Sequence, residues 1–303
     1  MGNRPTSDVF LQPGEVLDGK YEIIARIGQG GMGVVYKARA TALQRNVAIK
    51  MLTHVDEDTL RRFQREALSL AQINHLAVVR VDHFGDAGPL GPYLVLAYVA
   101  GQDLGHVAQT KLSVPDAVDL ALAIATGISA CHCRGIIHRD LKPSNVRVTT
   151  ATNWQSRVKI LDFGLALPFD SPILQAHHTR ITSMGSVPGT PRYIAPELLR
   201  HQEPTVKCDQ YGLASLLYLL LTQRAPFEDL EGEQLLQAIK DGNIVKPSLL
   251  RSELPRQLER LLLRGLHKDP SQRFDSVDDL AAELVPFASP KLQSSWTHYF
   301  ANA

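Results

Sequence analysis

The stretch that decides the fold is His-Arg-Asp-Leu-Lys-Pro-Ser-Asn at residues 138–145. It follows an apolar segment and sets an acid, a base and an amide close together in the chain. Two more short signatures follow it, Asp162-Phe163-Gly164 and Ala195-Pro196-Glu197. Two others precede it, Gly28-x-Gly30-x-x-Gly33-x-Val35 and Val47-Ala48-Ile49-Lys50. Any one of these motifs could arise by chance, but together and in this order they form a consistent set.

This ordered set resembles the signature of the protein kinases, and among them the bacterial eukaryotic-like (Hanks-type) serine/threonine protein kinase catalytic domain. The resemblance covers roughly residues 20–285. It implies an α+β, bilobal protein kinase fold, with a small antiparallel β-sheet N-lobe carrying one long helix and a larger, mainly helical C-lobe. The expected segments are an N-terminal extension 1–19, the N-lobe 20–98, a hinge 99–102, the C-lobe 103–285 with its activation segment 162–197, and a C-terminal tail 286–303.

The composition is that of an ordinary soluble globular protein, with 44% hydrophobic and 21% charged residues. A formal net charge of +1 provides no electrostatic footprint for nucleic acid. Three cysteines are too few for a disulfide framework and favour a reducing, cytoplasmic location. The polar start, residues 1–8, lacks the apolar core of a signal peptide. The apolar run 213–221 is far shorter than the about 20 residues that cross a bilayer, so no membrane span is expected in this chain.

The hydrophobic pattern changes along the chain from strand-like to helical. Short apolar runs predict strands at 21–24, 34–38 and 47–52, and the glycines and prolines of 85–92 predict a hairpin connection. One helix is expected among these strands, because apolar side chains recur at helical spacing between Leu60 and Leu70. Later helices are expected at 117–131, capped by Ser113, and at 209–221, 235–239, 258–266 and 277–284, with a strand at 157–161.

The glycine-rich motif lies between two predicted strands rather than between a strand and a helix. That context disfavours a dinucleotide-binding turn and favours a hairpin whose backbone N–H groups approach nucleotide phosphates, although a merely flexible turn is the simpler alternative. The family resemblance implies ATP as the cofactor. The residues that it assigns to ATP are Ile27, Gly28, Gln29, Gly30, Gly31, Met32, Gly33, Val35, Ala48, Lys50, Ala97, Val99 and Asp103.

The resemblance also assigns the catalytic roles. Asp140 matches the base that accepts the substrate hydroxyl proton, and Lys142 matches a lysine typical of serine/threonine kinases. Lys50 ends an apolar run, so we expect it to be half buried and paired with Glu66 on the following helix. Asn145 and Asp162 offer the hard oxygen ligands that Mg²⁺ requires, and Mn²⁺ is a possible substitute.

The resemblance also implies two contacts in the C-lobe: a buried ion pair between Glu197 and Arg273, and hydrogen bonds from the backbone of the 138–145 loop to Asp209. Cys131-His132-Cys133 could be read as a metal cluster, but two sulfurs that are two positions apart on a helix point to different faces. In the tail, Trp296, Tyr299 and Phe300 could dock a partner, although a frayed terminus is the commoner outcome.

Arg139 directly precedes Asp140, an arrangement that in the family goes with control by phosphorylation of the activation segment. The expected sites are Thr182 first, then Ser183, with Thr179 as a third possibility. Thr190, in Gly189-Thr190-Pro191, matches the hydroxyl beside the substrate pocket.

The sequence thus predicts an ATP-dependent serine/threonine protein kinase that acts in signalling, with protein substrates and a transient homodimer for autophosphorylation. Two alternative functions share some of these features. A catalytically dead scaffold usually lacks one of Lys50, Asp140 and Asp162, and all three are present. A small-molecule kinase should lack both Gly189-Thr190-Pro191 and Ala195-Pro196-Glu197, and both are present.

Overall fold

The computed structural model describes residues 10–30, 33–52, 57–162, 167–168 and 191–301. The described residues group into two compact units. The first unit comprises those of Met1–Asn74 and Val79–Ala100, and the second those of His75–Val78 and Gly101–Ala303. The predicted N-lobe ran unbroken from 20 to 98, whereas in the structure His75–Val78 groups with the second unit.

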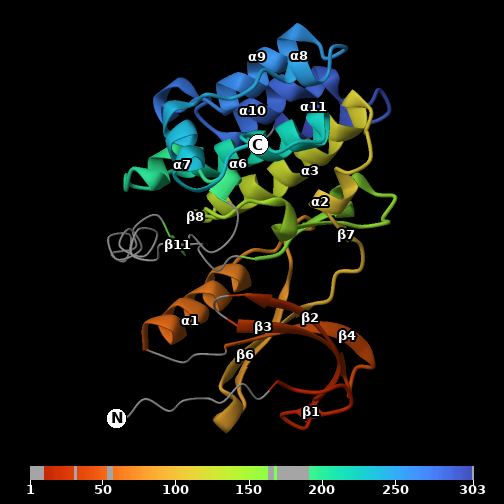
Figure 1. The fold of residues 1–303 in the computed structure, drawn as a ribbon. Helices are drawn as coiled ribbons and strands as arrows, with labels where there is room; N and C mark the ends of the chain where they lie inside the picture. The colour runs from red at the N-terminus through yellow and green to blue at the C-terminus, as the bar shows by residue number, and fades with distance from the viewer. Residues whose placement is uncertain (1–9, 31–32, 53–56, 163–166, 169–190, 302–303) are drawn as a thin grey trace. The chain divides into compact units, whose positions relative to one another are not determined.

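The first unit is a six-stranded antiparallel sheet with the order β1-β2-β3-β4-β6-β5 (Figure 1). Its buried face is lined by residues such as Ile23, Tyr36, Ile49 and Tyr93. Helix α1, Glu57–Ala71, is the one helix longer than a turn in this unit, and its Phe63 packs against Phe84 of β5 with ring centroids 5.7 Å apart. The strands are β1 Val16–Leu17, β2 Tyr21–Gly30, β3 Gly33–Ala40, β4 Arg45–Leu52, β5 Val81–Asp86 and β6 Pro92–Ala97, with the 3-10 helix η1 Gly88–Leu90 connecting β5 to β6.

The second unit is built around two helices that are buried on nearly every side, α3 Val114–His132 and α6 Val206–Thr222. Helix α10, Val277–Leu284, packs against both, and the helices lie side by side in Figure 1. Ser113 caps α3 as predicted, because its hydroxyl accepts the N–H of Asp116 at 3.1 Å. The remaining helices are α2 Leu104–Val107, α5 Pro196–Leu199, α7 Gly232–Asp241, α8 Pro247–Leu250, α9 Arg256–Gly265 and α11 Gln293–Phe300.

Short strands and single turns complete the second unit. A three-stranded sheet has the order β10-β9-β7, and β11 pairs with β8. The strands are β7 Gln102–Asp103, β8 Ile136–Ile137, β9 Val146–Val148, β10 Val158–Ile160 and β11 Leu167–Pro168. The 3-10 helices are η2 Pro143–Asn145, η3 Trp154–Ser156, η4 Pro191–Tyr193, η5 Pro270–Gln272 and η6 Val285–Phe287.

Helix α3 is the one described helix that is long and apolar enough to span a bilayer. Its apolar window is 78% buried within the unit, as expected of the core helix of a soluble fold.

The C-terminal tail differs from its prediction. The prediction of a frayed terminus is wrong for residues 286–301, because α11 packs on the second unit and Trp296 is completely buried. The aromatic side chains expected to fray or to dock a partner instead pack within this chain.

Candidate active site

The loop 138–145 brings its three predicted catalytic side chains together. It runs from β8 through η2 into β9. The Lys142 ammonium lies 2.6 Å from Oδ2 of Asp140. The amide Nδ2 of Asn145 donates to the backbone carbonyl of Asp140 at 2.8 Å and to its Oδ2 at 3.1 Å. Asn145 is buried, whereas Asp140 and Lys142 are partly exposed, so the carboxylate is both oriented and accessible.

A buried carboxylate holds this loop from beneath. Asp209 of α6 has no exposed surface and accepts the N–H of His138 at 2.8 Å and that of Arg139 at 2.7 Å, which confirms its predicted role. Burial alone would raise the pKa of Asp209, but the hydrogen bond from His132 and the other nearby donors outweigh it and hold the pKa below its usual value. Asp209 therefore remains an ionised acceptor.

His132 is a supporting residue that sequence reasoning missed. Its Nε2 lies 2.8 Å from Oδ2 of Asp209, although the sequence suggested a metal-cluster reading for it. The two neighbouring sulfurs point apart as expected, since Cys131 is buried and Cys133 is exposed. The signal that could have found this contact is the short connection, residues 133–137, which keeps the last turn of α3 close to the start of the 138–145 loop.

Arg139 has an unusual backbone and an unusual side chain. Its φ is +67°, a conformation that costs energy for any residue with a Cβ, and the hydrogen bond from its N–H to Asp209 helps to hold it. Within the described part of the chain, its Nε and Nη2 are buried without a hydrogen-bond partner. Burial lowers the pKa of this guanidinium, as expected for a cation that is poorly solvated.

The sheet of the first unit gathers the predicted nucleotide residues. Lys50 of β4 pairs in register with Val35 of β3, and Ala48 lies two residues before Lys50, so the three side chains share one face. Lys50 is buried. Gly33 must be glycine, because a Cβ there would lie 2.0 Å from the carbonyl oxygen of Met51. Ile27 is 43% exposed at the end of the hairpin.

The other predicted nucleotide and metal residues are also placed. Gly28 and Gln29 pair with β3 in the β2–β3 hairpin, Gly30 pairs with Gly33, and Ala97 pairs with Val47. Asp103 caps α2 by accepting the N–H of His106 at 2.9 Å, and Val99 is half-buried in the segment between β6 and β7. Asp162 follows β10 and is partly exposed. Glu66 lies on α1, but its side chain is not among those that the structure describes. The following predicted residues lie outside the described ranges: Gly31, Met32, Phe163, Gly164, Thr179, Thr182, Ser183 and Thr190.

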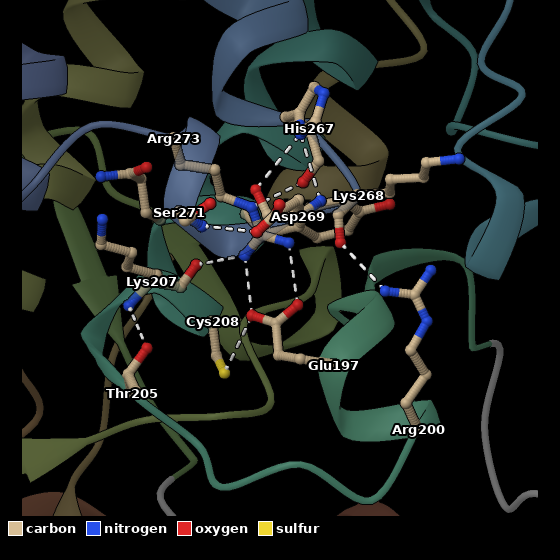
Figure 2. Close-up of polar contacts among 12 residues, drawn as sticks. Glu197, Arg200, Thr205, Lys207, Cys208, His267, Lys268, Asp269, Ser271 and Arg273 are labelled. Carbon is tan, nitrogen blue, oxygen red and sulfur yellow. Dashed lines mark hydrogen bonds and ion pairs between the residues drawn. The ribbon is translucent and has the colours of Figure 1, made fainter.

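The ion pair predicted between Glu197 and Arg273 is confirmed (Figure 2). Two parallel hydrogen bonds of 2.7 and 2.8 Å join the guanidinium to the carboxylate, and both side chains are buried. Arg273 also donates from Nε to the carbonyl of His267 and from Nη1 to that of Lys207, so all three of its side-chain nitrogens make hydrogen bonds. Burial raises the pKa of Cys208, whose protonated thiol donates to Glu197 at 3.3 Å.

The comparisons with known proteins agree with this geometry. Residues 21–285 match the protein kinase domain family. The chain is 35% identical over 287 residues to the serine/threonine-protein kinase pkn3 of Myxococcus xanthus, covering 92% of this chain and 52% of that protein. It is 34% identical over 279 residues to PrkC of Bacillus subtilis, covering 89% and 41%. The chain therefore spans about half or less of these relatives.

A solved structure shows the same architecture. The crystal structure of the Mycobacterium tuberculosis PknI kinase domain superposes with a TM-score of 0.69 at 25% identity, covering 92% of this chain and all of that one. The predicted α+β protein kinase fold, with a sheet-rich unit and a mainly helical unit, is thereby confirmed. The chain belongs to the protein kinase domain family, as a catalytic domain of the bacterial Hanks-type serine/threonine kinases.

Proposed function

We propose that this protein transfers the γ-phosphoryl group of ATP to serine and threonine hydroxyls of protein substrates. The observation that carries the proposal is the arrangement of Asp140, Lys142 and Asn145 on a loop that Asp209 anchors. A positioned carboxylate beside a cation suits proton removal from a hydroxyl and neutralisation of charge on a transferring phosphoryl group. We assign these two tasks to Asp140 and Lys142.

The residues present fit a magnesium ion. Because Nδ2 of Asn145 is engaged by Asp140, its Oδ1 remains as a neutral oxygen ligand, and Asp162 supplies a partly exposed carboxylate. These hard oxygens suit Mg²⁺, or Mn²⁺ in its place, and Mg²⁺ would neutralise charge on the phosphates of ATP. On the face shared by Val35, Ala48 and Lys50, we assign Lys50 to the phosphates and Val35 and Ala48 to the adenine.

His138 supports the base through its protonation state. Its ring is fully buried, and burial lowers its pKa, which keeps the imidazole neutral. A neutral ring can accept at Nδ1, and the N–H of Asp140 lies 3.3 Å from that atom. The N–H groups of both Arg139 and Asp140 are thereby held by hydrogen bonds, so Asp140 meets its substrate in a prepared geometry.

For the whole protein, we propose a signalling role in the cytoplasm. Its three free cysteines, of which Cys131 and Cys208 are buried, suit a reducing compartment. Two copies would meet transiently when one phosphorylates the activation segment of the other.

The direct test is incubation of the purified protein with ATP and Mg²⁺, followed by mass spectrometry of the products. We expect phosphate on serine and threonine in the protein itself and in a general substrate such as casein. Asp140→Asn protein is the matched control, because it keeps the shape of the loop. Phosphate mainly on tyrosine, or equal phosphate in the control, would contradict the proposal.

A second prediction concerns activation. Nε and Nη2 of Arg139 are buried without a hydrogen-bond partner among the described residues, and they suit a phosphate, which brings about −1.5 to −2 charges and three acceptor oxygens. We propose Thr182 as the first activating site and Ser183 as the second. Phosphatase treatment should lower initial rates on a peptide substrate by about 5- to 150-fold, the usual range of such couplings. Full activity after complete dephosphorylation, and in Thr182→Ala and Ser183→Ala proteins, would argue against this switch.

A further inference from the structure

Helix α11 lies beyond the family match, which ends at residue 285, yet it is firmly docked on the second unit. The indole N–H of Trp296 donates to Oδ1 of the buried Asp119 at 2.8 Å. The ring of Trp296 lies 4.2 Å from that of Trp154 in η3, and the ring of Tyr299 lies 5.8 Å from Trp154. We call Trp154, Trp296 and Tyr299 the aromatic cluster.

The aromatic cluster contacts His75–Val78, a short segment far from α11 in the sequence. Oη of Tyr299 lies 3.4 Å from Nε2 of His75. Nδ1 of His75 accepts the N–H of Ala77 at 3.1 Å. Burial lowers the pKa of His75, so the ring is neutral, and with Nδ1 as the acceptor its proton must be on Nε2. His75 therefore donates to Tyr299 while it shapes its own segment.

That segment lies directly beside β10. The carbonyl of Ala77 accepts the N–H of Ile160 at 2.8 Å, and Val78 forms a parallel bridge with Ile160. Nζ of Lys159 donates to the carbonyl of Val78 at 3.3 Å. Helix α11 thus contacts both segments that flank β10. Tyr299 meets His75, in the segment paired with β10, and Trp296 and Tyr299 pack on Trp154, in the turn that precedes β10 along the chain. Asp162 stands two residues after Ile160.

We propose that α11 is a positioning element for β10, and through β10 for Asp162. Tyr299 and Trp296 are its positioning residues, and neither touches substrate or metal. The placement of β10 follows from the contacts alone, whereas the consequence for Mg²⁺ rests on the proposed function of Asp162.

The first test is amide hydrogen exchange on the whole protein without ligand. Tyr299→Phe removes only the hydroxyl that meets His75, so amides at 158–161 should exchange about fivefold faster, the size expected for one lost hydrogen bond, while α6 stays protected. Ser294→Ala, at an exposed position on the same helix, is the matched control. Rates at 158–161 equal to those of the control, or equal acceleration in α6, would overturn the proposal.

The second test measures the link to the metal. Mg²⁺ is titrated at a fixed concentration of a non-hydrolysable ATP analogue, and Tyr299→Phe is expected to need several-fold more Mg²⁺ for half-saturation than Ser294→Ala. The chain has two tryptophans, and both belong to the cluster, so intrinsic fluorescence shows that α11 remains docked in each protein. Identical titrations would overturn the link to Asp162. A wild-type protein that binds no Mg²⁺–nucleotide would refute the proposed function instead, while the exchange result would still decide the role of α11.

Discussion

Replacing Asp140 with asparagine is expected to reduce turnover by about 10²–10⁴-fold, the contribution typical of a positioned general base. An amide cannot accept the proton of the attacking hydroxyl. The affinity for ATP should stay near the wild-type value, because we assign no nucleotide contact to Asp140. The measurement is the steady-state rate on a peptide substrate, together with the Kd for ATP from calorimetry.

A matched variant separates the two predicted carboxylate roles. Asp162→Asn removes a charged ligand, so it should weaken Mg²⁺-dependent nucleotide binding rather than act on the proton transfer alone. Comparing the change in kcat with the change in nucleotide affinity distinguishes the two roles. Asp140→Asn should change kcat with little change in affinity, and Asp162→Asn should change the affinity. Near wild-type turnover in Asp140→Asn would remove Asp140 from its assigned role, whatever Asp162→Asn does.

The sequence predicted most of the fold because its signals are local or follow family motifs. Strands β2, β3 and β4 and the helices α3 and α6 follow from apolar patterns within a single element, and the cap at Ser113 follows from the residues of the first helical turn. The contacts of Glu197 with Arg273 and of Asp209 with the 138–145 loop are confirmed although they are distant in sequence. The family motifs carried those two predictions, and no local pattern would have provided them.

What could not be predicted depends on tertiary packing without a motif. Trp296 and Asp119 are 177 positions apart, and nothing near either residue indicates their hydrogen bond. The docking of the tail was therefore missed. The grouping of His75–Val78 with the second unit could not be predicted for the same reason. Val78 pairs with Ile160 of the short strand β10, and nothing in the sequence indicates that pairing. Likewise, only the backbone coordinates reveal that Arg139 has a positive φ.

The largest stability effect should come from Arg273. Arg273→Met leaves Glu197 as a buried carboxylate that has lost its cation, and breaking such a pair on one side costs about 3–5 kcal/mol. The carbonyls of His267 and Lys207, which are part-buried, also lose their donor, and this adds to the loss. For a unit of this size, the loss should lower the Tm by roughly 10 °C in a thermal melt.

Arg200→Met is the matched control, since it removes the same charge from the same region (Figure 2). Arg200 is exposed and donates to the carbonyls of Lys268 and Lys240, so its loss should cost no more than about 1 kcal/mol. Glu197→Gln combined with Arg273→Met should recover part of the stability lost in Arg273→Met, because an amide is far cheaper to bury than an unpaired carboxylate. Arg273→Met and Arg200→Met melting at the same temperature would show that the buried pair contributes no more than a surface contact. The pair joins Glu197 at the start of α5 to the turn between α9 and α10, so it helps to hold residues 191–197, the end of the predicted activation segment, on the second unit.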